Sequence, residues 1–140
     1  MDFDTFNYLW IGVAIATFLA LVLFKVKAPY GRHSSEHWGP MISNKWGWFL
    51  MELPALVLMP LIALIGSSEK NEVSYLLIGL WVLHYAYRTL VCPFKLRTKN
   101  KKMPLLIVGS AVLFNGVNGF LNGYILGYLD PALFELESLH

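Results

Sequence analysis

The sequence predicts an all-α fold, a multi-span transmembrane helix bundle with four transmembrane helices. Hydrophobic residues make up 56% of the 140 residues and charged residues only 14%, whereas soluble domains average about 25% charged residues. Four stretches are apolar over the roughly 20 residues that a helix needs to cross a bilayer. Polar loops separate these stretches, and basic residues collect in every second loop.

The four expected spans cover residues 8–24, 46–65, 75–91 and 104–129. The first is preceded by Asp2 and Asp4 and is not followed by a small-residue cleavage site, so it is not expected to be a cleavable signal peptide. The second and third spans hold ionisable residues, and the fourth carries no formal charge. Together the spans are expected to form a single membrane domain over residues 1–140.

The basic residues predict how the bundle is oriented. The three loops between the spans hold four, one and five Lys or Arg residues, in that order. Because cytoplasmic loops are enriched in these residues, loops 25–45 and 95–102 are predicted to face the cytosol, and both termini the opposite side. The membrane would be that of the endoplasmic reticulum in a eukaryote, or the inner membrane in a bacterium.

The basic run KLRTKNKKM is interpreted as this topology signal, and no nucleic-acid partner is expected. A single cysteine, Cys92, excludes an internal disulfide, and no metal-ligand spacing is present, so no metal site is expected.

Two charged residues lie inside the spans, Glu52 in the second and Arg88 in the third. Charges at this depth are costly and usually face the interior of a bundle. Trp48 and Glu52 are four residues apart and share one helix face. On the third span, Tyr85 and Arg88 are three apart and His84 and Arg88 four apart, so these side chains can converge with Glu52 between two helices.

Two interpretations of this cluster stay open. Glu52 and Arg88 could form an ion pair that only locks two helices together. Alternatively, an apolar setting favours the neutral form of a carboxyl group, and a neutral acid beside a phenol supplies the paired donors that stabilise an enolate oxygen.

The fourth span carries two rows of residues. One row is polar and the other small: Asn115, Asn118 and Asn122, and Gly119, Gly123 and Gly127. Small residues at this spacing allow helices to approach closely. The asparagines need hydrogen-bond partners inside a membrane, so we expect them to line or brace a cavity.

Five motifs in order resemble one family. They are YGRH (30–33), WFLMELP (48–54), LHYAYRTLVCPF (83–94), MPLL (103–106) and FNGVNGFLNGY (114–124). Together they resemble the amino-terminal half of the steroid 5α-reductases, which read approximately YG(K/R), WFxQELP, HYxxRT, PxP and NGxLxGY. The resemblance implies a membrane enzyme that transfers hydride from NADPH to C5 of a 3-oxo-Δ4 steroid.

The resemblance also implies roles for individual residues. Glu52 and Tyr85 match the two family residues that hydrogen-bond the steroid 3-oxo group, and are the implied catalytic residues. Trp48 and Phe114 match residues that line the steroid cavity. Supporting or structural roles are expected for four further residues, Arg88, His84, Asn118 and Asn122.

The chain departs from the family in two ways. Met51 stands where the family often has glutamine, and family members continue for about as many residues again, with most of the NADPH contacts. The chain is therefore expected to be the substrate-binding half and to be inactive alone, with a carboxy-terminal half as a partner. Two alternatives are a non-catalytic membrane sterol-binding or partner module, and a related enoyl-CoA or polyprenol reductase.

Overall fold

The computed structural model describes residues 2–25, 38–95 and 101–129. The elements follow in this order: α1 (Phe3–Leu23), β1 (Met41–Ser43), α2 (Asn44–Ile65), α3 (Glu72–Ala86), the π-helical turn η3 (Tyr87–Val91), α4 (Cys92–Lys95), β2 (Lys102–Pro104) and α5 (Leu105–Tyr128). Because α3, η3 and α4 form one continuous span, four helical segments are long and apolar enough to cross a membrane. The predicted four-helix, all-α architecture is confirmed.

Two spans begin earlier than the apolar stretches alone indicate, because capping residues extend them. Asp2 caps α1 by accepting a hydrogen bond from the Thr5 backbone N–H at 2.8 Å. Asn71 caps α3 in the same way, accepting from the backbone N–H of Ser74 at 2.8 Å. Side chains of this type satisfy N–H groups that lack a partner in the first turn of a helix.

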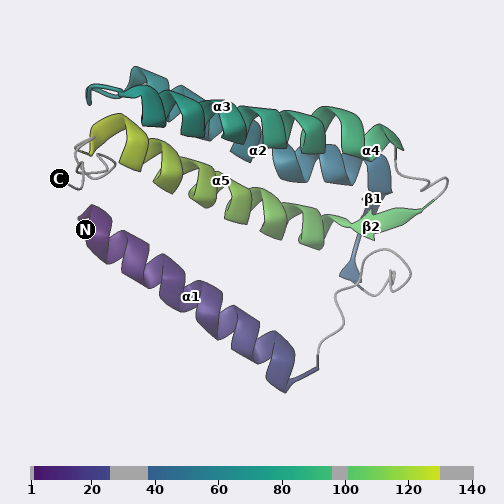
Figure 1. Ribbon diagram of the computed structural model, residues 1–140. Helices are drawn as coiled ribbons and strands as arrows, with labels where there is room; N and C mark the ends of the chain where they lie inside the picture. Colours follow the sequence, from purple (N-terminus) through teal and green to yellow (C-terminus); the bar gives the residue numbers. More distant parts are fainter. Residues whose placement is uncertain (1, 26–37, 96–100, 130–140) are drawn as a thin grey trace.

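Helices α2, α3 and α5 pack side by side as the body of the molecule, and α5 makes its main contact with α2 (Figure 1). The glycine row of α5 forms this seam. A Cβ at Gly123 would lie 2.8 Å from the Met59 carbonyl oxygen, and one at Gly127 would lie 2.6 Å from the Ile62 carbonyl oxygen. The predicted close approach is confirmed, since only hydrogen fits at these positions.

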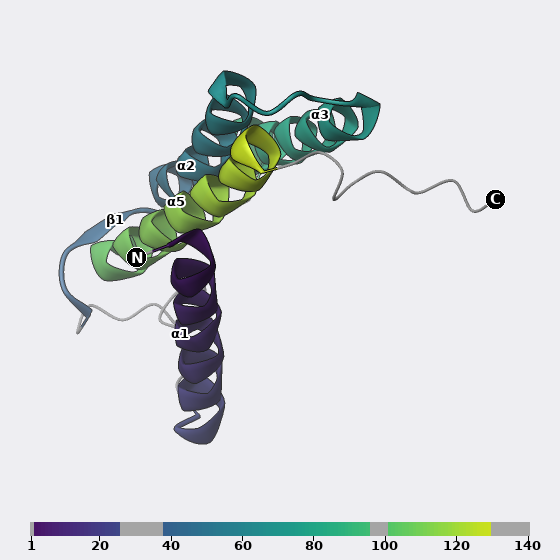
Figure 2. The same ribbon diagram turned by 90° about the vertical axis from the view of Figure 1, so that its left-hand side faces the viewer.

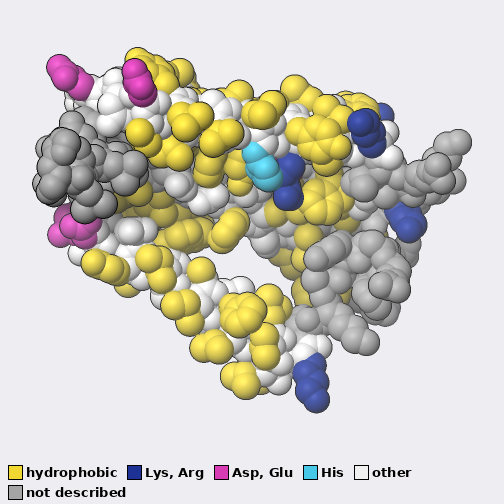
Figure 3. All heavy atoms as spheres, viewed as in Figure 1, with side chains coloured by type: hydrophobic (Ala, Val, Ile, Leu, Met, Phe, Trp, Pro, Cys, Tyr) yellow, Lys and Arg dark blue, Asp and Glu magenta, His cyan; other side chains and the backbone are white. Residues whose placement is uncertain are grey.

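The core of the body lies where α3 meets this seam. Met59 and Ala63 of α2, Ile78 of α3 and Leu126 of α5 are buried against one another, with Trp81 packed at their edge. Apolar side chains also cover much of the outer surface, which Figure 3 shows for one face. This distribution is typical of a bundle whose outer solvent is lipid.

A short strand pair joins the chain ahead of α2 to the chain ahead of α5. β1 and β2 are antiparallel, with Met41 opposite Pro104 and Ser43 opposite Lys102. Met103 is buried to 1% exposure against α2, where a Cβ on Gly47 would overlap its sulfur. The pair brings the described parts of the first and third loops to one end of the body, where basic side chains gather, while acidic ones gather at the other (Figure 3).

Helix α1 contacts the body near its amino end and then diverges from it, which Figures 1 and 2 both show. Three aromatic pairs make the contact with α5: Phe3–Tyr124, Phe6–Phe120 and Trp10–Phe114, with ring centroids 4.6, 6.3 and 5.8 Å apart. Beyond these pairs most side chains of α1 are exposed.

Candidate functional site

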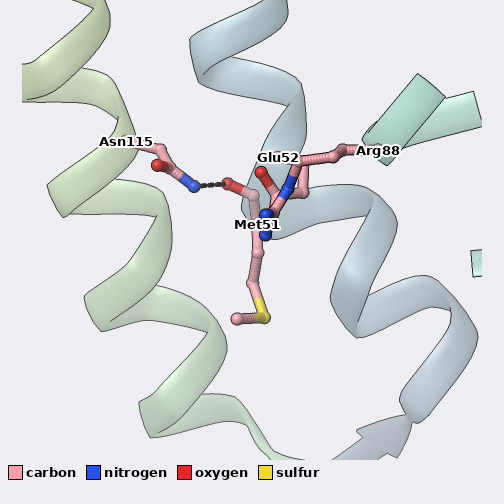
Figure 4. A network of polar contacts seen from close by, with 4 residues as sticks. All are labelled: Met51, Glu52, Arg88 and Asn115. Carbon is pink, nitrogen blue, oxygen red and sulfur yellow. Dashed lines mark hydrogen bonds and ion pairs between the residues drawn. The ribbon is translucent and has the colours of Figure 1, made fainter. Parts of the chain in front are cut away.

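The two intramembrane charges meet between α2 and the third span. Arg88 donates a hydrogen bond through Nη2 to Oε1 of Glu52, and the two form an ion pair. The Glu52 side chain is 5% exposed and that of Arg88 is 43% exposed. The acid is thus enclosed by the body, while the guanidinium reaches it from the surface (Figure 4).

A π-helical turn positions Arg88, where the sequence predicts regular helix. η3 runs over Tyr87–Val91 and holds Arg88 together with the fully buried Thr89. The Thr89 hydroxyl has no hydrogen-bond partner among the described residues. Such turns widen a helix locally and are frequent at functional sites, and here the turn sets the direction from which Arg88 approaches Glu52.

Tyr85 is half-buried and lies one turn before Arg88 on the third span. Its ring packs on Trp81 at 4.7 Å between centroids and against the edge of the His84 ring at 5.1 Å. Trp81 is itself fixed, because its indole N–H donates to the Ala55 carbonyl oxygen of α2 at 2.8 Å. Because Tyr85 packs on Trp81, its ring lies against the side chain that bonds to α2, the helix that holds Glu52.

One asparagine of the α5 row bonds to α2, and the other two bond to each other within α5. Asn115 donates to the Met51 carbonyl oxygen at 2.6 Å, and Figure 4 shows Asn115 and Arg88 approaching the same turn of α2 from two sides. Asn122 donates to the backbone oxygen of Asn118 at 2.8 Å and to its side-chain oxygen at 3.0 Å. Asn115, to which the family resemblance assigned no role, therefore makes a hydrogen bond that links α5 to α2 at this site.

A proline interrupts the backbone hydrogen bonds of α2 close to the Met51 contact. Pro54 lies inside the helix, three residues after Met51. A proline lacks the N–H that would complete the backbone hydrogen bonds of the preceding turn. The carbonyl group that loses its helical partner is that of Leu50, four residues before Pro54. The Met51 carbonyl oxygen lies next to it in the sequence and accepts from the Asn115 amide.

The remaining predicted residues lie apart from the ion pair. Trp48 is half-buried on α2, one turn before Glu52. Phe114 is 50% exposed and packs on Trp10 of α1, so its ring faces α1. His84 is exposed, and its ring packs on that of Tyr85.

An apolar groove lies on the other side of α2 from the third span. Its volume is about 470 Å³, and its lining comes from α1, α2 and α5: Phe6, Pro54, Leu58, Val112, Leu113, Gly116, Val117 and Phe120. Neither Glu52 nor Tyr85 is part of this lining. The groove is in the size range of small-molecule sites.

The chemistry available at the site is that of a buried acid, a phenol and a guanidinium in an apolar bundle. The phenol and the guanidinium donate hydrogen bonds, and the carboxyl group donates only when it is protonated. In the described arrangement Glu52 accepts from Arg88. Donors held in a dry site stabilise negative charge on an oxygen far better than donors in water do.

Comparison with curated proteins identifies the chain's relatives. Over 131 residues it is 37% identical to a steroid 5-alpha-reductase of Gossypium hirsutum. The aligned region covers 91% of this chain and 49% of that protein. It is 34% identical to the Arabidopsis thaliana protein of the same name, covering 92% and 52%. The chain is a homologue of about one half of a steroid 5-alpha-reductase.

A mammalian relative agrees with this assignment. The chain is 33% identical to 3-oxo-5-alpha-steroid 4-dehydrogenase 1 of Bos taurus, covering 97% of this chain and 55% of the relative. No family model matches the chain. The chain therefore spans about half the length of the steroid 5-alpha-reductases it matches, and with four helices long and apolar enough to cross a membrane it is an integral membrane protein.

Proposed function

We propose that this chain is a single membrane domain that supplies the substrate-binding half of an NADPH-dependent steroid 5α-reductase. The reaction is reduction of the Δ4 double bond of a 3-oxo steroid, in the endoplasmic reticulum membrane of a eukaryote or the inner membrane of a bacterium. The observation that carries the proposal is the buried Glu52 of α2, bound by Arg88 one turn after Tyr85 on the third span, in a chain homologous to half of such enzymes.

The proposed role of the site follows from how an enone is reduced. Adding hydride at the β-carbon moves electron density onto the carbonyl oxygen, so that negative charge grows there along the reaction path. The Tyr85 hydroxyl and the Glu52 carboxyl would hydrogen-bond this oxygen. Trp48 and Phe114 are proposed to contact the apolar rings of the steroid, which partitions into the surrounding lipid.

Arg88 gives Glu52 a second role to be tested. While Glu52 accepts from Arg88, it fixes the third span against α2 and acts as a positioning residue for Tyr85. To donate to a carbonyl oxygen, it must carry a proton and share or release this contact. We propose that Arg88, His84, Asn118 and Asn122 support the pair rather than contact the reacting atoms.

NADPH would supply the hydride. The described residues contain no set of side chains that would hold both a nicotinamide ring and its phosphates, so no step through the cofactor is derived from them. Most cofactor contacts are proposed to come from a further, carboxy-terminal part of the enzyme. The isolated 140-residue chain is accordingly expected not to oxidise NADPH when a steroid is added.

The ion pair itself favours one other candidate, a non-catalytic membrane module that binds sterols. In such a module the Glu52–Arg88 contact would only lock two helices, and breaking a buried pair by removing one partner is strongly destabilising. The two candidates differ in what a conservative change at Glu52 does, because a lock loses stability whereas a reductase loses rate.

A chimera tests the proposal. This chain replaces the matching half of the Gossypium hirsutum reductase, and reduction of a 3-oxo-Δ4 steroid is followed with NADPH. We expect Tyr85→Phe and Glu52→Gln each to lower kcat by about 10²–10³, because one donor to a developing oxyanion is worth that much. Melting temperatures measured on the same preparations should change little.

Tyr87→Phe is the matched control, because Tyr87 is a half-exposed tyrosine two residues along the same span; it should keep wild-type kcat. A wild-type chimera that does not reduce the steroid would refute the reductase proposal. An unstable Glu52→Gln variant whose surviving protein turns over normally would support the lock instead.

A further inference from the structure

The outer face of the third span carries two polar side chains at membrane depth. His84 is exposed, and Arg88, one turn later, has a side chain that is 43% exposed. We call these two residues the His84–Arg88 face. Figure 3 shows a histidine and a basic side chain together in the middle of a surface that is otherwise hydrophobic, and His84 is the histidine that the described ranges contain.

The depth of this face excludes contact with lipid headgroups. His84 stands twelve residues after Glu72 and eleven before Lys95, the two ends of the span. At 1.5 Å per residue this places it roughly 16 Å or more from either end. Arg88 cannot extend freely toward the surface, because its contact with Glu52 holds it against α2.

Both side chains are left with hydrogen-bond donors. A guanidinium group has five N–H donors, and within the described residues Arg88 donates to Glu52 through Nη2. The His84 ring has an N–H in every protonation state. Its described contact is an edge-to-face packing with the Tyr85 ring. Hydrocarbon tails offer no acceptor, and unsatisfied polar groups are costly in that medium.

The charge balance indicates what kind of partner is needed. Glu52 already neutralises Arg88, so the face requires oxygen acceptors rather than a net negative charge. Amide, hydroxyl or backbone carbonyl oxygens on a neighbouring helix are such acceptors, and polar side chains do join helices across membrane interfaces. The curated relatives are about twice as long as the chain, so they contain further sequence that could supply the helix.

We infer that the His84–Arg88 face is an interface, covered by a membrane-spanning helix that presents oxygen acceptors and comes from the half of the reductase that this chain does not match. This inference rests on the proposed half-enzyme. It specifies the surface of the α2–α3–α5 body that the other half contacts, and the hydrogen-bonding groups that the other half presents there.

Photo-cross-linking tests the inference. The full chain is co-expressed with the non-matching half of the Gossypium hirsutum reductase, and benzoylphenylalanine is placed at Leu77 or, separately, at Leu76. Leu77 is seven residues before His84 and therefore on the same side of the helix. Leu76 is at the same depth, is 60% exposed, and is turned about 100° away. We expect a product with the summed mass of the two chains from position 77 and severalfold less from position 76.

A second comparison makes the test specific for the polar contact. His84→Leu should lower the yield from position 77 severalfold, whereas Leu83→Ala, a change at a 70% exposed neighbour, should not. Equal yields from positions 76 and 77, no product from 77, a product with the mass of two copies of this chain, or an unchanged yield in His84→Leu would each overturn the inference.

The cross-link requires neither steroid nor NADPH. If the chains cross-link as expected but the chimera does not reduce a steroid, only the proposed reaction fails. If the chimera is active but no cross-link forms at position 77, only the interface fails.

Discussion

Helix α5 makes two contacts of opposite character. Against α2 it presents glycines, and backbone lies close to backbone from Gly119 to Gly127. Against α1 it presents aromatic rings, and the contact is confined to the amino end of α1. A contact without side chains has nothing that can rotate away, so it tolerates no added atom. A contact between rings can lose one ring and keep the others.

The largest expected effect comes from adding side-chain volume to the glycine seam. Gly123→Val should lower stability by about 3 kcal/mol or more, because the new Cβ would meet the Met59 carbonyl oxygen and the Ile62 Cβ at 2.8 and 2.9 Å. The measurement is the thermal midpoint in detergent, followed by size-exclusion chromatography.

The matched control for this change is Gly79→Ala on α3. A Cβ at Gly79 has nothing within 4 Å, and alanine favours helix over glycine by about 1 kcal/mol. The control should melt at or above the wild-type temperature. A Gly123→Val protein that melts like the wild type would mean that the seam is looser than described.

The next effect concerns the polar link beside the seam. Asn115→Leu removes the donor to the Met51 carbonyl oxygen and should cost about 1 kcal/mol, the size of a single interhelical hydrogen bond in a membrane. Ser110→Ala is the control, because that hydroxyl bonds within its own helix, to Leu106. If both variants melt at the same temperature, the asparagine does not brace α2.

A smaller effect on stability is expected from the aromatic contact. Phe6→Ala removes one ring pair, worth about 0.5–1.5 kcal/mol beyond the buried area, and should barely change the melting of the α2–α3–α5 body. Spin labels at the exposed Tyr8 and Leu113 should nevertheless report a broader distance distribution. Phe18→Ala, at a ring that is 66% exposed, should leave that distribution unchanged. Equal broadening in both variants would contradict the aromatic attachment.

The smallest effect is the pH dependence of the α1 cap. Hydrogen bonds from the Thr5 side chain and backbone N–H hold the pKa of Asp2 below its ordinary value of 3.8. A lowered pKa means that the cap contributes fully above pH 3.8 and is lost as the pH falls through the folded-state pKa. The protection factor of the Thr5 amide, which compares its exchange rate with the intrinsic rate at the same pH, should therefore fall in acid. Asp2→Asn should show no such step.

Much of this fold follows from local sequence. The four spans could be predicted because about 20 apolar residues in a row leave a chain few alternatives to a membrane helix. The glycine row predicted the close approach of α5 to a neighbouring helix, and the charges inside two spans predicted that Glu52 and Arg88 meet. In each case the signal lies within one or two turns of helix.

The remainder depends on contacts between distant segments. β1 and β2 are three residues each, too short for alternation to indicate a strand, and they pair only because α2 and α5 begin side by side. The π-turn at Arg88 has no composition signal. From the sequence, Phe114 is compatible with a substrate contact and equally with a packing contact to Trp10. The roles of Glu52 and Tyr85 remain predictions until the chimera is assayed.

The β1–β2 pair has a consequence for how the protein enters a membrane. Met41 can reach Pro104 only if the third loop returns to the side of the bilayer on which the first loop lies. An α5 inserted in the wrong direction would leave β2 on the far side, beyond reach of its partner. Strand pairing therefore favours the correctly threaded chain after synthesis of the first three spans. It checks sidedness independently of the lysines and arginines.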